Sequence, residues 1–225
     1  MSVLDQDQKK NDLVTLDLPP KVKEYYNTLR DRILLSSDET SGPMQLISVT
    51  ACYGKEGTST IAANLAVTLA HHGSVLLLDA NVNRPSLHKI FRLDLSPGLA
   101  ETLQSEDRHV AISKTAQNLD VLSAGHLNGN VPILMESPQN LSELLSTYKR
   151  SYRFVVLDSP PVNEKSAALR LASLVDGVIL VVEAERTRWE AVRRVKDQLL
   201  QVKANVLGIV LNKRRFPIPS FMYRR

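Results

Sequence analysis

Two glycines, the second followed directly by three hydroxyl residues, form the part of this chain best suited to bind a phosphate group. An apolar, β-branched run at 47–50 precedes them, and a helical pattern of apolar residues begins at Ser59. A loop between a buried strand and a helix directs the first backbone amides of that helix at an anion. We therefore predict a phosphate-binding loop that consists of Gly54, Lys55, Glu56, Gly57, Thr58, Ser59 and Thr60.

The loop departs from the usual phosphate-loop sequence at one position. That sequence ends in Gly-Lys-Ser or Gly-Lys-Thr, and its lysine contacts the β- and γ-phosphates. With Gly57 as the last glycine and Ser59 as the hydroxyl residue, Thr58 occupies the lysine position. The register that uses Lys55 as this lysine is rejected, because it puts Glu56 where the magnesium-binding hydroxyl belongs. Lys55 either reaches the phosphates from its own position or is a solvated loop residue.

Two aspartates end buried apolar runs, Asp79 after 75–78 and Asp158 after 154–157. Ligands bind where the carboxyl ends of parallel strands meet. One carboxylate from each strand, together with Ser59, is a typical oxygen ligand set for a nucleotide-bound Mg²⁺. We predict that these three residues bind the metal of Mg–ATP or Mg–ADP, and that both aspartates are catalytic if the protein transfers phosphate. The alternative is that each aspartate only caps a loop.

Apolar runs that alternate with helical patterns predict an α/β fold. Continuous apolar strands are typical of a parallel sheet that is buried on both faces. The predicted strands are 47–50, 75–78, 119–122, 154–157, 177–182 and 206–211. The predicted helices lie at 21–36, from 59, around 87–91 and 99–103, from 138, at 166–174 and up to 202. We expect a single P-loop NTPase-like domain with a mainly parallel sheet and helices on both faces.

Local sequence signals predict how some of these helices begin and pack. Thr187 and Glu190 have the spacing of a capping box for the last helix, and Ser137 is placed to cap the helix that begins at 138. In the first helix, Tyr25 and Tyr26 are predicted to be packing residues rather than phosphorylation sites.

Length and composition predict three segments. The 225 residues comprise a polar, disordered lead at 1–20, a domain at 21–212 that includes the helix 21–36, and a basic extended tail at 213–225. The formal net charge of +4 does not by itself imply nucleic acid, and the single cysteine, Cys52, suits a reducing compartment. No apolar run approaches the roughly 20 residues of a membrane span. We expect a cytoplasmic protein.

Several motifs of this chain resemble the cytoplasmic domain of bacterial tyrosine kinases, which control capsule and exopolysaccharide assembly. EGTSTIAANLAVTLA resembles the Walker A loop and helix of that family, VLLLDANVNRPSLHKIF its Walker A′ motif, and FVVLDSPPV its Walker B motif. KEYYNTLRDRILLSS resembles its oligomerising N-terminal helix, and GLAETL and LVDGVILVVEAERTRWEAV complete the set. Partition and septum-site ATPases share the Walker motifs, whereas NRPSLHKIF and LDSPPV narrow the resemblance to the kinases.

The chain differs from this family at charged positions. The family has a lysine at the position of Thr58, an aspartate at that of Asn81 and an arginine at that of Asn83. Asparagine cannot neutralise a metal as a carboxylate does, and phosphoryl transfer depends on positioned charge. The resemblance therefore implies magnesium–nucleotide binding with weak or no phosphotransfer. Arg84 either takes over the role of the missing arginine or points away from the site.

The resemblance also implies an oligomer interface, a phosphate acceptor and an adenine contact. The interface motif Glu-x-x-Arg-x-x-Arg reads Glu24, Asn27 and Arg30 here, so one arginine is lost and homo-oligomer formation is weakened. The C-terminal tyrosine cluster is reduced to Tyr223, the candidate phosphate acceptor. Asn212 follows the last predicted strand, where it either binds adenine or only begins a loop.

Three functions remain open at this stage. We favour a nucleotide-binding, tyrosine-kinase-like regulator of capsule or exopolysaccharide biosynthesis and chain length. A membrane-spanning polysaccharide co-polymerase would be its partner and would hold it at the inner face of the plasma membrane. The second function is that of an active autophosphorylating protein-tyrosine kinase that uses Lys55. The third is a partition- or localisation-type ATPase, but Pro217 and Pro219 oppose the amphipathic C-terminal helix that it needs, and no nucleic-acid partner is expected.

Overall fold

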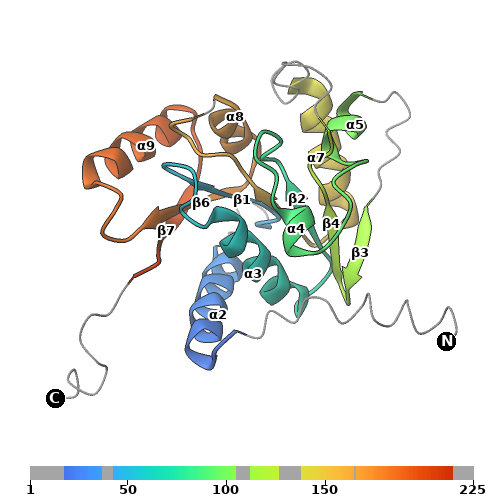
Figure 1. Ribbon diagram of the computed structural model, residues 1–225, viewed down its shortest axis with the longest axis horizontal. Helices are drawn as coiled ribbons and strands as arrows, with labels where there is room; N and C mark the ends of the chain where they lie inside the picture. The colour runs from blue at the N-terminus through green and yellow to red at the C-terminus, as the bar shows by residue number, and fades with distance from the viewer. Residues whose placement is uncertain (1–17, 37–42, 105–111, 127–137, 165, 215–225) are drawn as a thin grey trace, which may run out of the picture.

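The computed structural model has a central sheet with helices on both faces (Figure 1). It describes residues 18–36, 43–104, 112–126, 138–164 and 166–214. The strands are β1 (Leu46–Ala51), β2 (Val75–Asp79), β3 (Ser113–Ala116), β4 (Leu119–Leu122), β5 (Phe154–Asp158), β6 (Gly177–Glu183) and β7 (Val206–Asn212). The helices are α2 (Pro20–Leu35), α3 (Thr58–Ala70), α4 (Leu87–Ile90), α5 (Leu99–Gln104), α7 (Pro138–Ser151), α8 (Ser166–Leu174) and α9 (Trp189–Gln201).

Within the described residues the sheet has seven strands in the order β3-β4-β2-β5-β1-β6-β7. Only the β3–β4 pair is antiparallel. The three central strands β2, β5 and β1 are buried along their whole length, as the uninterrupted apolar runs predicted. The predicted α/β fold with a mainly parallel sheet is therefore confirmed.

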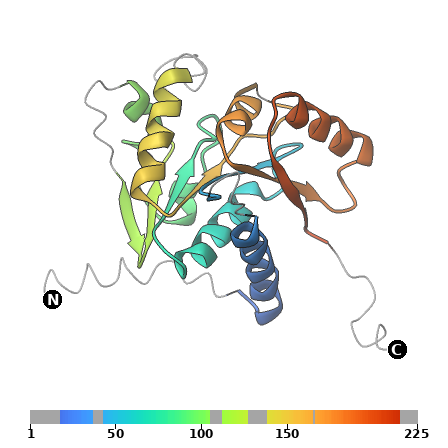
Figure 2. The same ribbon diagram turned by 180° about the vertical axis from the view of Figure 1, so that it is seen from behind.

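The helices form two layers that bury both faces of the sheet (Figures 1 and 2). Ile33 of α2, Leu65 of α3 and Leu87 of α4 belong to the core on one face. On the other face, α5, α7, α8 and α9 bury residues such as Leu145 and Leu199. The predicted buried stripe of α7 is present as Leu141, Leu144, Leu145 and Tyr148.

The sequence-based assignment missed β3 and made five other strands, β1, β2, β5, β6 and β7, one or two residues too short. Residues Ser113–Ala116 form a short edge strand with alternating, half-exposed side chains, so its apolar signal is weak. Strands β2 and β5 include Asp79 and Asp158 instead of ending before them. Strand β7 likewise includes Asn212 as its last residue.

The predicted capping box of α9 is wrong. Arg188 is the N-cap residue of this helix and makes no side-chain capping bond. The Thr187 hydroxyl donates to the Glu56 carboxylate instead, because the preceding turn carries it against the phosphate loop. The predicted cap Ser137 lies outside the described residues.

One of the two tyrosines predicted to pack in α2 is exposed. Tyr26 is buried and its hydroxyl oxygen accepts a hydrogen bond from Asn64 Nδ2 at 3.0 Å. Tyr25 is 72% exposed, because α2 presents only one face to α3. The interpretation of Tyr25 as a packing residue is therefore wrong.

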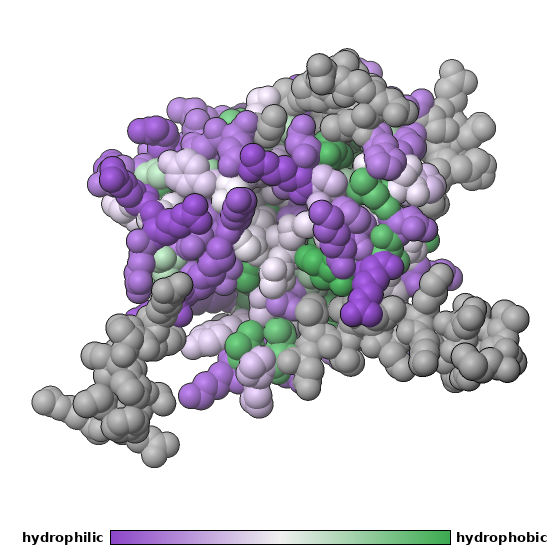
Figure 3. Space-filling view, in the orientation of Figure 1, coloured by the Kyte–Doolittle hydropathy of each residue, from purple (hydrophilic) through white to green (hydrophobic). Residues whose placement is uncertain are grey.

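No helix of the described ranges is long and apolar enough to cross a membrane. On the face shown in Figure 3, hydrophilic side chains dominate the region of α9. The predicted lead at 1–20 and tail at 213–225 lie almost wholly outside the described residues, and their conformations stay predictions.

Candidate functional site

The loop between β1 and α3 has the geometry that a phosphate-binding loop requires. Gly57 is the N-cap residue of α3 and has a φ of 94°, a conformation that residues with a side chain rarely adopt. A Cβ atom at this position would also collide with the side-chain amide nitrogen of Asn212. The first N–H groups of α3 have no acceptor within the helix, so they are available to an anion.

A cavity of about 670 Å³ lies in front of these amides. The loops that follow β1, β2 and β5 contribute to its wall, so the cavity lies at the carboxyl edge of the sheet. Its lining residues are Gly54, Lys55, Gly57, Thr58, Ser59, Thr60, Asn81, Arg84, Ser86, Ile90, Ser159 and Pro161. The structure thus brings together every predicted loop residue except Glu56.

Glu56 shapes the loop from behind and does not line the cavity. Its side chain is buried, and one carboxylate oxygen accepts the backbone N–H groups of Cys52 at 2.8 Å and Tyr53 at 3.1 Å. The other oxygen accepts the Thr187 hydroxyl. The carboxylate therefore satisfies donors that the tight turn would otherwise bury without a partner, and it is placed to support the loop rather than to contact a ligand.

The end of β7 holds the same loop from the opposite side. Asn212 Nδ2 donates to the Glu56 carbonyl oxygen at 2.9 Å, and Lys213 Nζ donates to the Lys55 carbonyl oxygen at 2.6 Å. Lys213 also pairs with Glu183 at 3.1 Å. Asn212 is not part of the cavity lining, and its contact with adenine stays a prediction.

Asp79 lies at the carboxyl end of β2, where backbone groups hold its side chain. One carboxylate oxygen accepts the N–H groups of Ser86 at 2.9 Å and Leu87 at 3.0 Å, and the other accepts that of Asn81 at 3.2 Å. The side chain is fully buried. Burial raises the pKa of Asp79 from 3.8 to about 6, although the three hydrogen bonds oppose this rise.

Asp158 lies beside Asp79 because the two residues are paired in register on the neighbouring strands β5 and β2. Its side chain is completely buried, and neither carboxylate oxygen accepts a hydrogen bond of normal geometry within the described residues. Burial raises the pKa of Asp158 well above its ordinary value, and the negative charge of Asp79 raises it further. The nearby Ser59 hydroxyl offsets only a small part of this rise.

Two adjacent buried carboxylates, one without hydrogen-bond partners, fit a divalent cation. Ser59 completes an oxygen ligand set at the start of α3, and its Oγ lies 2.6 Å from Ser86 Oγ. The described residues contain no group of three or more His, Cys, Asp or Glu that could hold a metal ion by themselves. A small ligand set is what Mg²⁺ uses when phosphate oxygens and water complete its coordination.

Sequence reasoning missed four residues of the cavity wall. They are Ser86, Ile90, Ser159 and Pro161. Ser159 and Pro161 directly follow Asp158, so the rule that ligands bind beyond strand ends could have found them. Ser86 precedes the four-residue helix α4 and Ile90 ends it; both lie in the motif NRPSLHKIF, but no spacing rule singled out their side chains.

Arg84 faces the site, whereas Asn83 is exposed and does not line the cavity. Arg84 Nη1 lies 3.4 Å from the Glu164 carboxylate. Of the two sequence-based alternatives for Arg84, the structure supports the one in which its side chain faces the site.

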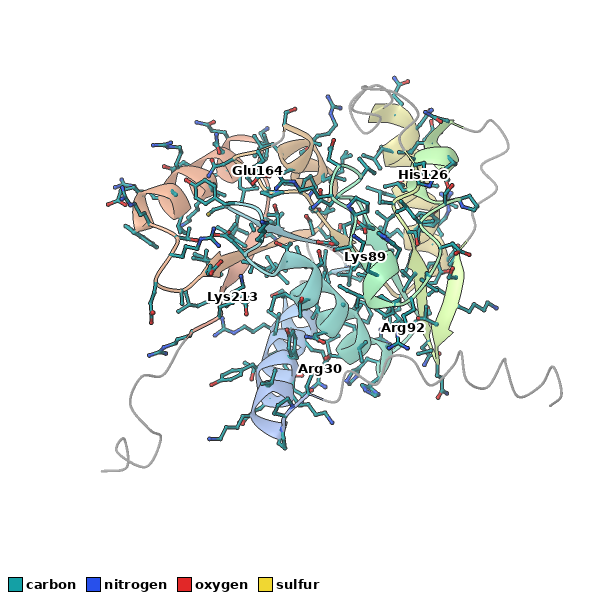
Figure 4. All side chains as sticks on the ribbon, viewed as in Figure 1. Arg30, Lys89, Arg92, His126, Glu164 and Lys213 are labelled. Atoms are coloured by element: carbon teal, nitrogen blue, oxygen red, sulfur yellow. The ribbon has the colours of Figure 1, made fainter. Side chains whose placement is uncertain are left out.

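The predicted interface residues lie on α2, away from the cavity. Glu24 is exposed, and Arg30 pairs with Asp31 at 2.8 Å and donates to Asn27 Oδ1 at 3.0 Å (Figure 4). Asn27, at the position where the family's motif has its first arginine, thus accepts a hydrogen bond from Arg30. The interface itself stays a prediction, and Tyr223 lies outside the described residues.

With this geometry established, comparison with known proteins identifies the class of protein. Residues 43–223 match the ParA family model, described as NUBPL iron-transfer P-loop NTPase. The chain therefore belongs to this family of P-loop NTPases.

Within this class, several similar proteins are tyrosine kinases. The chain is 32% identical over 195 residues to the tyrosine-protein kinase YwqD of Bacillus subtilis, covering 85% of this chain and 81% of YwqD. It is 30% identical over 204 residues to the putative tyrosine-protein kinase CapB of Staphylococcus aureus, covering 85% and 84% of the two chains. The crystal structure of the chimerical protein CapA2B2 has a TM-score of 0.80 at 28% identity, covering 92% and 91%. The chain thus belongs to the bacterial tyrosine kinase family, and the resemblance inferred from its motifs is confirmed.

Proposed function

We propose that this protein binds a magnesium–nucleotide and acts as a tyrosine-kinase-like regulator of capsule or exopolysaccharide biosynthesis, with weak or no phosphotransfer. The observation that carries the proposal is the buried Asp79–Asp158 pair beneath the phosphate loop. Two carboxylates without a neutralising group are unfavourable in a folded protein unless a cation or a proton joins them. Mg²⁺ bound to a nucleotide supplies that cation and leaves its phosphates at the amides of α3.

Different residues would bind the metal and the phosphates of the magnesium–nucleotide. Ser59, Asp79 and Asp158 would hold Mg²⁺, which supplies charge neutralisation for the phosphates. The backbone N–H groups of Thr58, Ser59 and Thr60 would bind the phosphate oxygens. Glu56 would preserve the shape of the loop, because its carboxylate already holds two loop amides.

Threonine in place of lysine at position 58 supports weak phosphotransfer. Threonine supplies no positive charge at the β- and γ-phosphates, and positioned charge supplies most of the rate enhancement in phosphoryl transfer. Asn81 lines the cavity where the family has an aspartate, which removes a second charged group. Binding depends on more groups than the missing lysine, so it is expected to survive this loss better than catalysis.

A membrane-spanning polysaccharide co-polymerase is the proposed partner, and it would place this cytoplasmic protein at the inner face of the plasma membrane. The similarity to the chimerical protein CapA2B2 and to named tyrosine-protein kinases supports this assignment. Nucleotide occupancy would control association with that partner or with further copies of the chain through Glu24 and Arg30 on α2.

The second candidate is an active autophosphorylating kinase, and the kinase names of the relatives favour it. In this case Lys55, which lines the cavity, would supply the missing positive charge. Incubation with Mg–ATP followed by mass spectrometry of the Tyr223 peptide separates the two candidates. Tyr223→Phe is the matched control. Phosphorylation at Tyr223 at rates typical of kinases would establish the second candidate and exclude the first.

Calorimetric titration with Mg–ATP and Mg–ADP tests nucleotide binding directly. We expect wild type to bind, Asp158→Ala to bind at least tenfold more weakly, and Thr58→Lys to bind more tightly. Circular dichroism and thermal unfolding of each variant verify that it is folded. Absence of binding by folded wild type, with or without gain by Thr58→Lys, would refute the proposed nucleotide site.

A further inference from the structure

Glu164 accepts from two donors that belong to residues lining the phosphate cavity. Its Oε1 accepts the backbone N–H of Gly54 at 2.8 Å, and its Oε2 lies 3.4 Å from Arg84 Nη1. Both Gly54 and Arg84 line the cavity. A carboxylate that takes a loop amide and a guanidinium has the hydrogen-bonding pattern of a phosphate group in the same place.

The three groups are in close contact. An added Cβ at Gly54 would lie 2.9 Å from Arg84 Nη1 and 2.9 Å from Glu164 Oε1. The glycine therefore leaves the space in which the guanidinium and the carboxylate meet against the loop. Figure 4 shows Glu164 on the α8 side of the loop, opposite Lys213 at the end of β7.

The segment that carries Glu164 is anchored to the backbone of β1 and of the loop. The N–H of Val162 donates to the Ala51 carbonyl oxygen at 2.9 Å, and that of Asn163 donates to the Cys52 carbonyl oxygen at 3.3 Å. These bonds bring the next residue, Glu164, back over Gly54. The Arg84 side chain, in contrast, is 67% exposed, so solvent reaches the guanidinium while it pairs with Glu164.

We propose that Glu164 is an internal competitor of the nucleotide phosphates: it holds Arg84 and the Gly54 amide in the ligand-free protein, and a bound phosphate displaces it from Arg84. This inference rests on the proposed nucleotide-binding function and adds a determinant of affinity to it. Arg84 and Lys55 are the two cationic residues of the described cavity lining. With threonine at position 58, Arg84 becomes the phosphate-binding cation whose availability Glu164 limits.

The test is a double-mutant cycle of Glu164→Gln and Arg84→Ala, with Mg–ATP and Mg–ADP affinities measured by calorimetry. Glutamine preserves an oxygen acceptor for the Gly54 amide and removes the negative charge. We expect Glu164→Gln to tighten Mg–ATP binding roughly fivefold or more, and Arg84→Ala to weaken it by a similar factor. In the Arg84→Ala background, Glu164→Gln should change the affinity less than about twofold.

A charge-matched control and a ligand-free readout complete the experiment. Glu190→Gln removes an exposed charge on α9, remote from the cavity, and should leave binding unchanged. Modification of Arg84 by phenylglyoxal, followed by mass spectrometry without nucleotide, should be faster in Glu164→Gln than in wild type. A merely structural role of Glu164 would predict weaker binding and no selective change at Arg84.

The possible outcomes separate this inference from the proposed function. Binding by wild type with no gain in Glu164→Gln, or with an equal gain in the Arg84→Ala background, overturns the competition and leaves the nucleotide site intact. Absence of binding in wild type and in Glu164→Gln alike overturns both.

Discussion

Replacing Asp158 with asparagine should stabilise the ligand-free protein at neutral pH. Asparagine has the same shape as aspartate but no charge, and the Asp158 oxygens accept no hydrogen bond of normal geometry that the change would break. The side-chain amide can instead donate to Asp79, its partner in register on β2. The substitution therefore removes the repulsion between the two buried carboxylates. It also removes the cost of burying an ionisable group at position 158.

The size of the effect follows from the pKa of Asp79. A rise from 3.8 to about 6 corresponds to about 3 kcal/mol of lost stability at neutral pH, at about 1.4 kcal/mol per pKa unit. Burial and the charge of Asp79 raise the pKa of Asp158 in the same direction, so Asp158→Asn should increase the free energy of unfolding at pH 7.5.

The direction of the two pKa shifts determines how the free energy of unfolding changes with pH. In the folded protein, Asp79 and Asp158 stay protonated at pH values at which the same residues of the unfolded chain have already lost their protons. Stability from these protons is therefore present below about pH 4 and is lost as the pH rises through about 6. The difference between Asp158→Asn and wild type should be small near pH 4 and should grow toward pH 7.5.

Urea unfolding from pH 4 to pH 7.5, in the presence of a metal chelator, measures this difference. Asp176→Asn is the matched control. Burial opposes the ionisation of Asp176, but the Leu46 amide, Lys149 at 2.8 Å and the Gln45 amide lower its pKa, so loss of this carboxylate should destabilise the protein at neutral pH. An Asp158→Asn variant that is less stable than wild type at pH 7.5, or whose stability difference does not vary with pH, would refute the reasoning. Addition of Mg–ATP should stabilise wild type and not the variant.

Three further predictions concern buried polar groups. Glu56→Gln should lower the free energy of unfolding by about 1 kcal/mol, measured with urea, because a neutral amide oxygen replaces the charged oxygen that accepts the N–H groups of Cys52 and Tyr53; an unchanged midpoint would contradict this. Lys149→Met should lower stability by about 1 kcal/mol at pH 7, and the effect should fade as acid protonates Asp176; a constant loss down to pH 2 would exclude the ion pair as its cause. Burial raises the pKa of the Cys52 thiol to about 12, so alkylation of the native protein should be slower than that of the unfolded chain by on the order of a thousandfold, as mass spectrometry can measure; rapid native labelling would show that the thiol is accessible.

Much of the site could be predicted because it depends on local sequence. Gly57 and the hydroxyl residues after it identify the loop, and Asp79 and Asp158 are recognisable as the ends of apolar strands. Their proximity follows from a general property of parallel sheets, in which strand ends meet at one edge. The same rule did not reveal the pairing of the two aspartates in register, because strand order is not written in any single strand.

Residues that act over long separations could not be found in this way. Glu164 lies 110 residues from Gly54, and Lys213 lies 158 residues from Lys55. Exposed glutamates and lysines are common in loops and carry no periodic signal. Their contacts form only when the sheet places the loops that contain them side by side.

The sequence by itself determined the α/β class, the position of the phosphate loop, the threonine at its lysine position and the carboxylates that face it. Spacing and side-chain chemistry suffice for these features, because strand, loop and helix are contiguous. The tertiary structure alone decided that Glu56 supports the loop from behind, that Tyr25 is exposed, and that Glu164 contacts both Arg84 and the Gly54 amide. These features depend on which face of a helix is covered and which loops meet, and packing of distant segments sets both.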